Sequence, residues 1–185
     1  MKNKTKNRLF GSVRILTVSA FLVALSIICG KYLQIPVGNV MRFSLENLPI
    51  LFAGFAFGPV VGALVGTVAD LIGCVLVGYT VNPVVTLGAA LIGAVGGLAY
   101  LALSKIKLPT WLRVLIAVAL AHAVGSVAVK TLGLAAFYDM PYHILLLWRS
   151  LNYLIVAILE SSLLFMLFEN KTIEAKIASI KPKKP

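Results

Sequence analysis

Apolar segments close to 20 residues long, separated by prolines, glycines and a few charges, constrain this chain more than any other feature. An α-helix needs about 20 apolar residues to cross the hydrocarbon core of a bilayer. Six segments approach this pattern, at roughly 12–31, 46–57, 59–78, 83–104, 110–133 and 143–169. We therefore predict an all-α fold, an integral membrane bundle of six transmembrane helices.

The composition supports this class, since 60% of the residues are hydrophobic and 12% are charged. A soluble domain is about half apolar and about a quarter charged. We predict one membrane domain over 1–185, with a basic segment at 1–11, the bundle at 12–170 and a basic tail at 171–185. Gly58-Pro59 separates the short second segment from the third, because proline breaks the helical hydrogen-bond ladder. In a five-span alternative, 46–78 is one bent helix.

The basic residues predict the orientation in the membrane. Of the 17 Lys and Arg residues, a six-span layout places Lys31, Arg42, Lys130 and Arg149 on the side opposite the termini and the others on the side of the termini. Because positive charge collects on the cytoplasmic side, we expect both termini inside a bacterial plasma membrane. The net charge of +11 suits anionic lipid head groups rather than nucleic acid.

Small residues recur every four positions in three segments. The third and fourth segments contain Gly58, Gly62, Gly66, Ala89, Gly93 and Gly97. That spacing puts them on one helix face, where two backbones can approach closely, so we expect packing within the bundle. Ala20 and Ala24 repeat the spacing in the first segment, where the residues alone do not distinguish internal packing from docking to another chain.

Polar side chains inside the apolar segments are candidates for function, because burying them in lipid is costly. They are Asp70, Asn82, Thr86, His122, Ser126, Lys130, Arg149, Asn152 and Glu160. Most fall in the outer halves of four segments, which predicts a pocket open to the outside. His122 and Glu160 lie deeper, and we interpret them as structural.

Structural roles remain as alternatives for several of these residues. Asp70 could form a buried bridge with Lys130 or Arg149. Asn82 could cap the helix that begins at Pro83, since Asn-Pro favours a helix start. A further set of residues could stack on a ligand or form an aromatic belt at the membrane surface: Tyr79, Tyr138, Tyr142 and Trp148.

The long segment from Lys31 to Asn47 resembles a lid over the pocket. On the outer side, four basic residues face the carboxylates of Glu46, Asp70 and Asp139. The pocket is therefore slightly electropositive, and an anionic ligand suits it.

The sequence has no motif for ATP hydrolysis, zinc chemistry or serine hydrolysis, since G-x-x-x-x-G-K-[ST], H-E-x-x-H, C-x-x-C and G-x-S-x-G are all absent. Cys29 and Cys74 are expected to be inert thiols. We predict no catalytic residue, no metal and no cofactor. The chain is expected to be a binding protein without an energy source of its own, not an enzyme.

A series of motifs resembles the substrate-binding S components of energy-coupling factor (ECF) vitamin transporters. It runs through Met41–Ile50, Ala53-Gly54, Phe57–Pro59, Gly62, Gly66 and Ala69–Gly73. The family pattern is approximately R-x-S-x-x-x-L-P-I, then A-G-x-x-F-G-P, then G-x-x-x-G-x-x-x-D-x-I-G. The chain is most similar to the folate branch, although it has Val81–Thr86 where many folate-type members carry a sequence like F-P-G-F-T-L.

The resemblance implies a mechanism and partners. Such proteins capture a vitamin from outside, join a scaffold membrane subunit and two cytoplasmic ATPases, and topple in the membrane to release the vitamin inside. A small-residue motif in their first helix docks to the scaffold subunit, and Ala20 and Ala24 match it.

If the ligand is folate, as the resemblance implies, its chemistry suggests partners among the polar residues. Asp70, Asn82 or Asn152 would bind the pterin edge, with Thr86 beside them. Phe43, Tyr79 or Tyr138 would stack on the rings. Arg42, Lys130 or Arg149 would pair with the carboxylates. An S component for another vitamin, such as pantothenate or riboflavin, stays open, and a membrane-embedded enzyme acting on lipid or a structural membrane protein is a more distant alternative.

Overall fold

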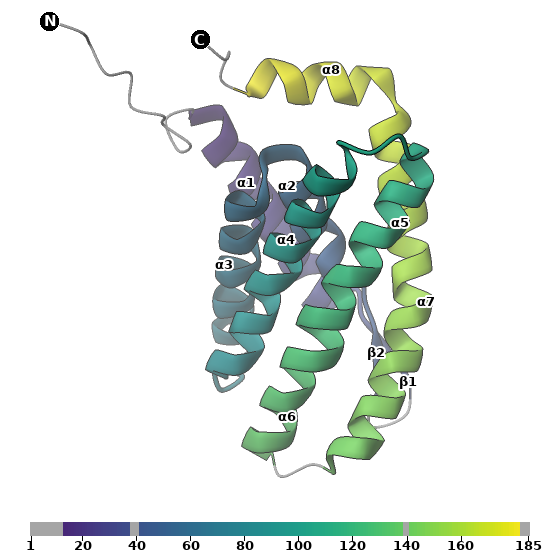
Figure 1. Cartoon of the computed structure of the whole chain (residues 1–185). Coiled ribbons are helices and arrows are strands. Elements are labelled where there is room, and N and C mark those ends of the chain that lie inside the picture. Colours follow the sequence, from purple (N-terminus) through teal and green to yellow (C-terminus); the bar gives the residue numbers. More distant parts are fainter. Residues whose placement is uncertain (1–12, 38–40, 139–140, 182–185) are drawn as a thin grey trace, which may run out of the picture.

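The computed structural model describes residues 13–37, 41–138 and 141–181. Its elements, in chain order, are α1 (Val13–Ile27), the π-helix η1 (Ile28–Tyr32), β1 (Ile35–Val37), β2 (Met41–Phe43), α2 (Asn47–Phe57), α3 (Pro59–Val77), α4 (Pro83–Leu103), α5 (Thr110–Ala121), the π-helix η2 (His122–Val129), α6 (Lys130–Tyr138), α7 (Tyr142–Glu169) and α8 (Lys171–Ile180). Figure 1 shows them as an elongated bundle. The predicted all-α membrane bundle is confirmed.

Five helical stretches in the described residues are long and apolar enough to cross a membrane: Val13–Tyr32, Pro59–Val77, Pro83–Leu103, Thr110–Phe137 and Tyr142–Glu169. The α2 helix has 11 residues and is therefore about 16 Å long, which is too short for a hydrocarbon core of about 30 Å. The six-span count and the cytoplasmic location of both termini stay predictions. The start of α1 and the end of α7 do lie at the same end of the bundle (Figure 1).

The boundary between α2 and α3 is a chain reversal rather than a bend. Gly58 has φ of +101°, a conformation that favours glycine, and Pro59 begins the next helix. The two helices then pack face to face, since a Cβ on Gly62 would lie 2.7 Å from the Cα of Gly54. The alternative of one bent helix over 46–78 is therefore wrong.

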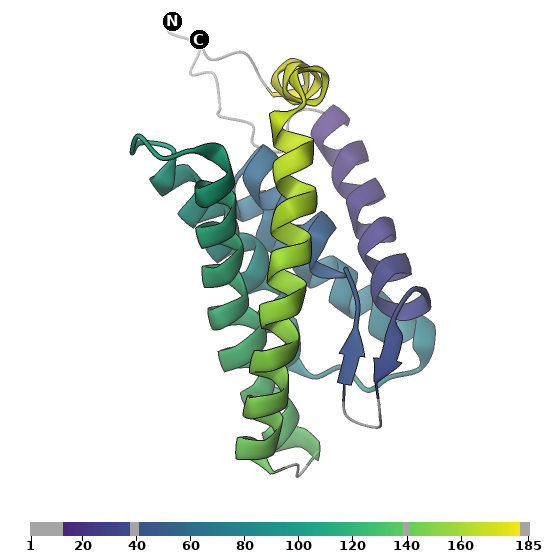
Figure 2. The ribbon, with the colours of Figure 1, turned by 90° about the vertical axis from the view of Figure 1, so that its right-hand side faces the viewer.

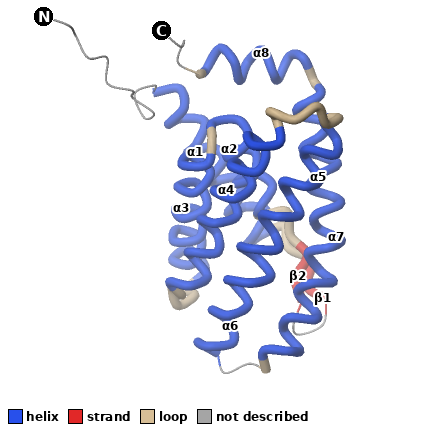
Figure 3. Tube along the Cα trace, in the orientation of Figure 1, coloured by secondary structure: helices blue, strands red, loops and turns tan. Residues whose placement is uncertain are grey.

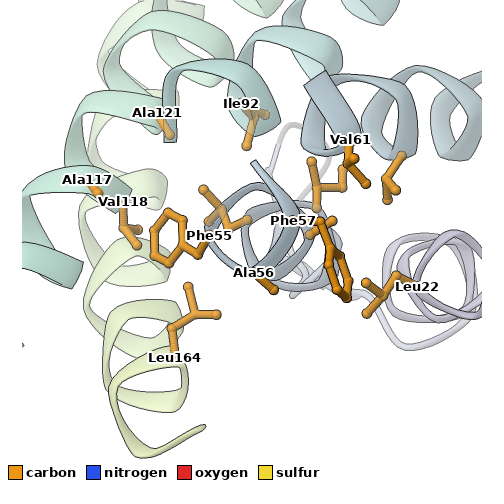
Figure 4. Close-up of a cluster of buried hydrophobic side chains, with 14 of the residues drawn as sticks. Leu22, Phe55, Ala56, Phe57, Val61, Ile92, Ala117, Val118, Ala121 and Leu164 are labelled. Atoms are coloured by element: carbon orange, nitrogen blue, oxygen red, sulfur yellow. The ribbon is translucent and has the colours of Figure 1, made fainter. Parts of the chain in front are cut away.

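The α2 helix forms the centre of the hydrophobic core. Nine of its residues are buried, among them Leu51 and Phe55. In Figure 4, Phe55, Ala56 and Phe57 are surrounded by side chains from the other helices, such as Leu22, Ile92, Val118 and Leu164. A helix that is apolar on all sides is stable when other helices surround it, which explains why so short a segment is so hydrophobic.

The α3 and α4 helices pack through their small residues, as the four-residue spacing predicts. A Cβ on Gly97 would lie 2.8 Å from the carbonyl oxygen of Gly54, and one on Gly93 would overlap the backbone of Gly62. The α2, α3 and α4 backbones are therefore in direct contact, which only glycine permits at these positions.

Two elements differ from the expectations. The segment predicted as a long loop contains an antiparallel hairpin in which Ile35 pairs with Phe43 and Val37 with Met41. Figure 2 shows this hairpin near the lower end of α1, and it is the strand pair coloured red in Figure 3. The predicted basic tail contains α8, which lies across the end of the bundle (Figure 1) and buries Ile177.

The glycine contact between α3 and α4 gives a direct test. In an ordinary helix, Gly→Ala stabilises by about 1 kcal/mol, but Gly93→Ala places a methyl group against the Gly62 backbone. We expect it to destabilise the detergent-solubilised protein by about 1–3 kcal/mol, measured by denaturant titration. The control is Leu98→Ala on α4, where the leucine is 61% exposed. This substitution should change the free energy of unfolding by less than about 0.5 kcal/mol. Equal stability of Gly93→Ala and the unmodified protein would contradict the packing.

Candidate substrate-binding site

A cavity of about 440 Å³ lies in the half of the bundle away from the start of α1. The elements around it are η1, the hairpin, the ends of α3 and α7 that lie farthest from α8, the start of α4, and α6 (Figure 1). Its polar lining is Lys31, Gln34, Arg42, Ser44, Glu46, Asp70, Tyr79, Thr80, Asn82, Lys130, Arg149, Asn152 and Tyr153. Residues far apart in the sequence thus meet around one space.

Most of the residues proposed from the sequence lie around this cavity: Arg42, Asp70, Tyr79, Asn82, Lys130, Arg149 and Asn152. Thr86 does not line it but donates a hydrogen bond to the Asp70 carboxylate at 2.6 Å. Phe43 ends β2 without lining the cavity. Tyr138 ends α6, and its side chain lies outside the described part of the chain. A role of these residues in binding stays a prediction.

The cavity is also lined by three residues that are not among those predicted from the sequence: Lys31, Glu46 and Tyr153. The positions of Lys31 and Glu46 could have indicated a place in the site, because they are charged residues at the two ends of the predicted lid. The position of Tyr153 indicates little, since one tyrosine in an apolar helix is equally typical of a membrane surface.

Lys130 pairs with Glu46, not with Asp70. Its Nζ lies 3.1 Å from Glu46 Oε1, and the lysine is 5% exposed. Partial burial favours a raised pKa for the Glu46 carboxyl, but the ammonium groups of Lys130 and Lys31 outweigh it and hold that pKa below its ordinary value. The ion pair joins the start of α2 to the start of α6 and forms one wall of the cavity. The alternative bridge from Asp70 to Lys130 or Arg149 is absent among the described residues.

The two arginines of the cavity bind neutral groups. Arg42 donates from Nη1 to the Tyr79 hydroxyl at 3.2 Å and lies 5.8 Å from the centre of that ring. Arg149 donates from Nε and Nη2 to the carbonyl oxygen of Ser126, at 3.3 and 2.9 Å. Lys31 also lies over the Tyr79 ring, at 5.5 Å. Within the described residues, no carboxylate oxygen is within 4 Å of these three cations.

Asn82 has the structure of a helix cap. Its Oδ1 accepts hydrogen bonds from the amides of Val84 and Val85, at 3.0 and 3.3 Å, and its Nδ2 donates to the carbonyl of Gly133 at 2.9 Å. This arrangement matches the capping alternative and ties α4 to α6. Asn152, in contrast, has a buried Oδ1 with no partner among the described residues, so its amide can accept a bond from a ligand.

The cavity therefore combines an aromatic face, a carboxylate, an amide and three cations without carboxylate partners. Such a set can hold a flat, hydrogen-bonding ring system together with anionic groups. Among the described residues, there is no group of three His, Cys, Asp or Glu side chains that could hold a metal ion.

Several solved structures share this fold. A structure described as FolT bound with folic acid superimposes with a TM-score of 0.67 at 22% identity, covering 82% of this chain and 92% of that one. A structure of the S component of a bacterial ECF transporter gives 0.63 at 24% identity, covering 84% and 93%. The S component for biotin from an ECF-type ABC transporter gives 0.65 at 21% identity, covering 92% and 95%.

Comparison with curated proteins gives no match. The family model for the substrate-specific component of ECF transporters, however, matches residues 14–169, which is most of the chain and includes the whole cavity. This multi-pass membrane protein belongs to the substrate-specific (S) components of ECF transporters.

Proposed function

We propose that the chain captures folate from outside the cell and delivers it to an ATPase-driven ECF module. The observation that carries this proposal is the charge of the cavity. Lys31, Arg42 and Arg149 have no carboxylate within 4 Å among the described residues, whereas Lys130 and Glu46 neutralise each other. Asp70 offsets one of the three cations, which leaves an excess of two positive charges.

A ligand with two carboxylates matches this excess. Folate has two on its glutamate tail, whereas biotin and pantothenate have one and riboflavin has none. Lys31 and Arg149 are half-buried and Arg42 is exposed at the cavity. A positively charged cavity attracts anions, so the dianion gains most from the three cations. The second carboxylate therefore favours folate over the other vitamins.

The remaining polar groups suit the pterin ring. Its amino and amide edge both donates and accepts hydrogen bonds, and the Asp70 carboxylate and Asn152 Oδ1 supply acceptors. Tyr79 offers an aromatic face for stacking. The volume of about 440 Å³ falls in the ordinary range for small-molecule sites.

Delivery requires partners, because the sequence has no ATP-binding motif. ECF S components bind vitamins and associate with an ECF module, which here would be a scaffold membrane subunit and two cytoplasmic ATPases. Ala20 and Ala24 are both exposed on α1, so this face suits docking to the scaffold. We propose that docking makes the bundle topple, with both termini cytoplasmic and anionic lipids at the basic ends. Because the family comprises transporter components, an enzyme acting on lipid is not supported.

Ligand preference tests the proposed function first. Isothermal titration of the purified chain in detergent should show tighter binding of folic acid than of biotin, pantothenate or riboflavin, because the second carboxylate pairs with an otherwise unpartnered cation. Tighter binding of the uncharged riboflavin would contradict the charge argument.

Arg149→Ala should weaken folic acid binding at least about tenfold, because losing one partner of a buried charged contact costs about 2–5 kcal/mol. Arg113→Ala is a matched control. Arg113 also donates to a backbone carbonyl, that of Leu108 at 3.3 Å, and lies over the Tyr100 ring at 5.8 Å, but it is near the start of α5 at the other end of the bundle. The control should leave the affinity unchanged. Unchanged affinity in Arg149→Ala as well would exclude Arg149 from the site.

Docking can be tested apart from binding. The double variant Ala20→Leu with Ala24→Leu should keep folic acid affinity but abolish uptake into cells that contain the module, because larger side chains hold the two helices apart. Ala119→Leu, at an exposed position of α5, should leave uptake intact. Normal uptake by the double variant would show that α1 docks through other residues.

A further inference from the structure

A buried polar cluster lies behind the cavity. His122 and Ser126 come from η2 and Glu160 comes from α7, and their exposures are 2%, 0% and 0%. His122 Nε2 lies 2.7 Å from Glu160 Oε2, and His122 Nδ1 lies 3.0 Å from Ser126 Oγ. None of the three side chains lines the cavity. Such a cluster is expensive in a membrane bundle, so it calls for a function.

The cluster connects to the cavity through Arg149. Both Nε and Nη2 of this arginine donate to the carbonyl oxygen of Ser126, the residue whose hydroxyl meets His122. Tyr153 supplies a second connection, since its ring stacks on His122 with centroids 5.0 Å apart and lies 5.2 Å from the Arg149 guanidinium carbon. Arg149, Tyr153 and Glu160 lie four and seven residues apart on α7, and thus on one helix face.

The π-helical geometry of η2 makes the carbonyl of Ser126 available. In an α-helix, this carbonyl would accept from the amide of Lys130, four residues later. Here that amide bonds instead to the carbonyl of Gly125. The extra residue in the turn leaves the Ser126 oxygen to accept from Arg149 and, at 3.5 Å, from the Thr131 hydroxyl. Such turns are frequent at functional sites.

We propose that His122, Ser126, Tyr153 and Glu160 are positioning residues that hold Arg149 in the orientation needed to bind a ligand carboxylate. Glu160 fixes the imidazole of His122, which in turn fixes Ser126 and the ring of Tyr153. Two nitrogens of Arg149 are thereby occupied, and Nη1 has no partner among the described residues and is left for the ligand. The inference rests on the proposed binding of a carboxylate vitamin and names the residues that set its affinity.

A double-mutant cycle tests the proposal with folic acid and the full-length chain in detergent. Glu160→Gln should weaken binding about tenfold in the otherwise unmodified chain, a size typical of coupled neighbours. On the Arg149→Ala background it should change the affinity less than about twofold, because no arginine remains to be positioned. A general structural defect would lower the affinity equally on both backgrounds, and that result would overturn the proposal.

Tyr153 provides a second cycle that leaves the contact between His122 and Glu160 intact, in case Glu160→Gln does not fold. Tyr153→Leu removes the ring and should weaken binding only when Arg149 is present. The matched control Tyr100→Leu removes a ring that lies 5.8 Å from the guanidinium carbon of Arg113, outside the cavity, and should leave the affinity unchanged. An equal loss with Tyr153→Leu on both backgrounds would show that the ring contacts the ligand itself, which would contradict a positioning role.

The outcome is separable from that of the proposed function. If the unmodified chain binds biotin or pantothenate instead of folic acid, folate is wrong as the ligand, and the same two cycles with that vitamin still decide the positioning role. If it binds riboflavin alone, or none of these vitamins, there is no ligand carboxylate for Arg149, and the inference falls as well.

Discussion

The cost of leaving a charge unpaired inside a membrane protein governs the structure of this chain. Each polar residue in the bundle must find a partner in the protein, reach water or receive a ligand. Lys130 finds Glu46, His122 finds Glu160, and Asn82 binds backbone groups of α4 and α6. Lys31, Arg42 and Arg149, which have no carboxylate within 4 Å among the described residues, are gathered around one cavity, and their charge suits an anion.

Packing at the other end of the bundle makes this arrangement possible. The α2 helix is surrounded by apolar side chains, and glycine contacts bring α2, α3 and α4 together without intervening side chains. Close-packed interiors deform little, so this end is a rigid base. The hairpin and the far ends of α3, α4, α6 and α7 extend from it and form the cavity wall.

Helix positions could be predicted from the sequence because prolines and glycines interrupt long apolar runs. Pro59, Pro83 and Thr110 begin helices as expected. The hairpin could not be predicted, since three-residue strands give too short an alternating pattern. The π-helix η2 could not be predicted either, because its residues continue the apolar pattern of α5 and one extra residue in a turn leaves no mark in that pattern.

The composition of the site was more predictable than its pairing. Polar residues in outer halves of apolar segments pointed to the cavity, since little else tolerates them there. The pairing of cations with carboxylates depends on the path of the segment between α1 and α2, which the sequence does not show. The sequence therefore allows a bridge between Lys130 and Asp70, whereas in the structure Lys130 pairs with Glu46. Asn82 was identified both as a cap and as a cavity residue, and the structure shows that one side chain occupies both places.

An experimental structure of the chain with bound folic acid tests the central claim most directly. The account predicts that both glutamate carboxylates of the ligand lie within hydrogen-bonding distance of the cations Lys31, Arg42 or Arg149, while Lys130 stays paired with Glu46. Carboxylates that point out of the cavity into solvent, with these three cations still bound to neutral groups, would contradict it.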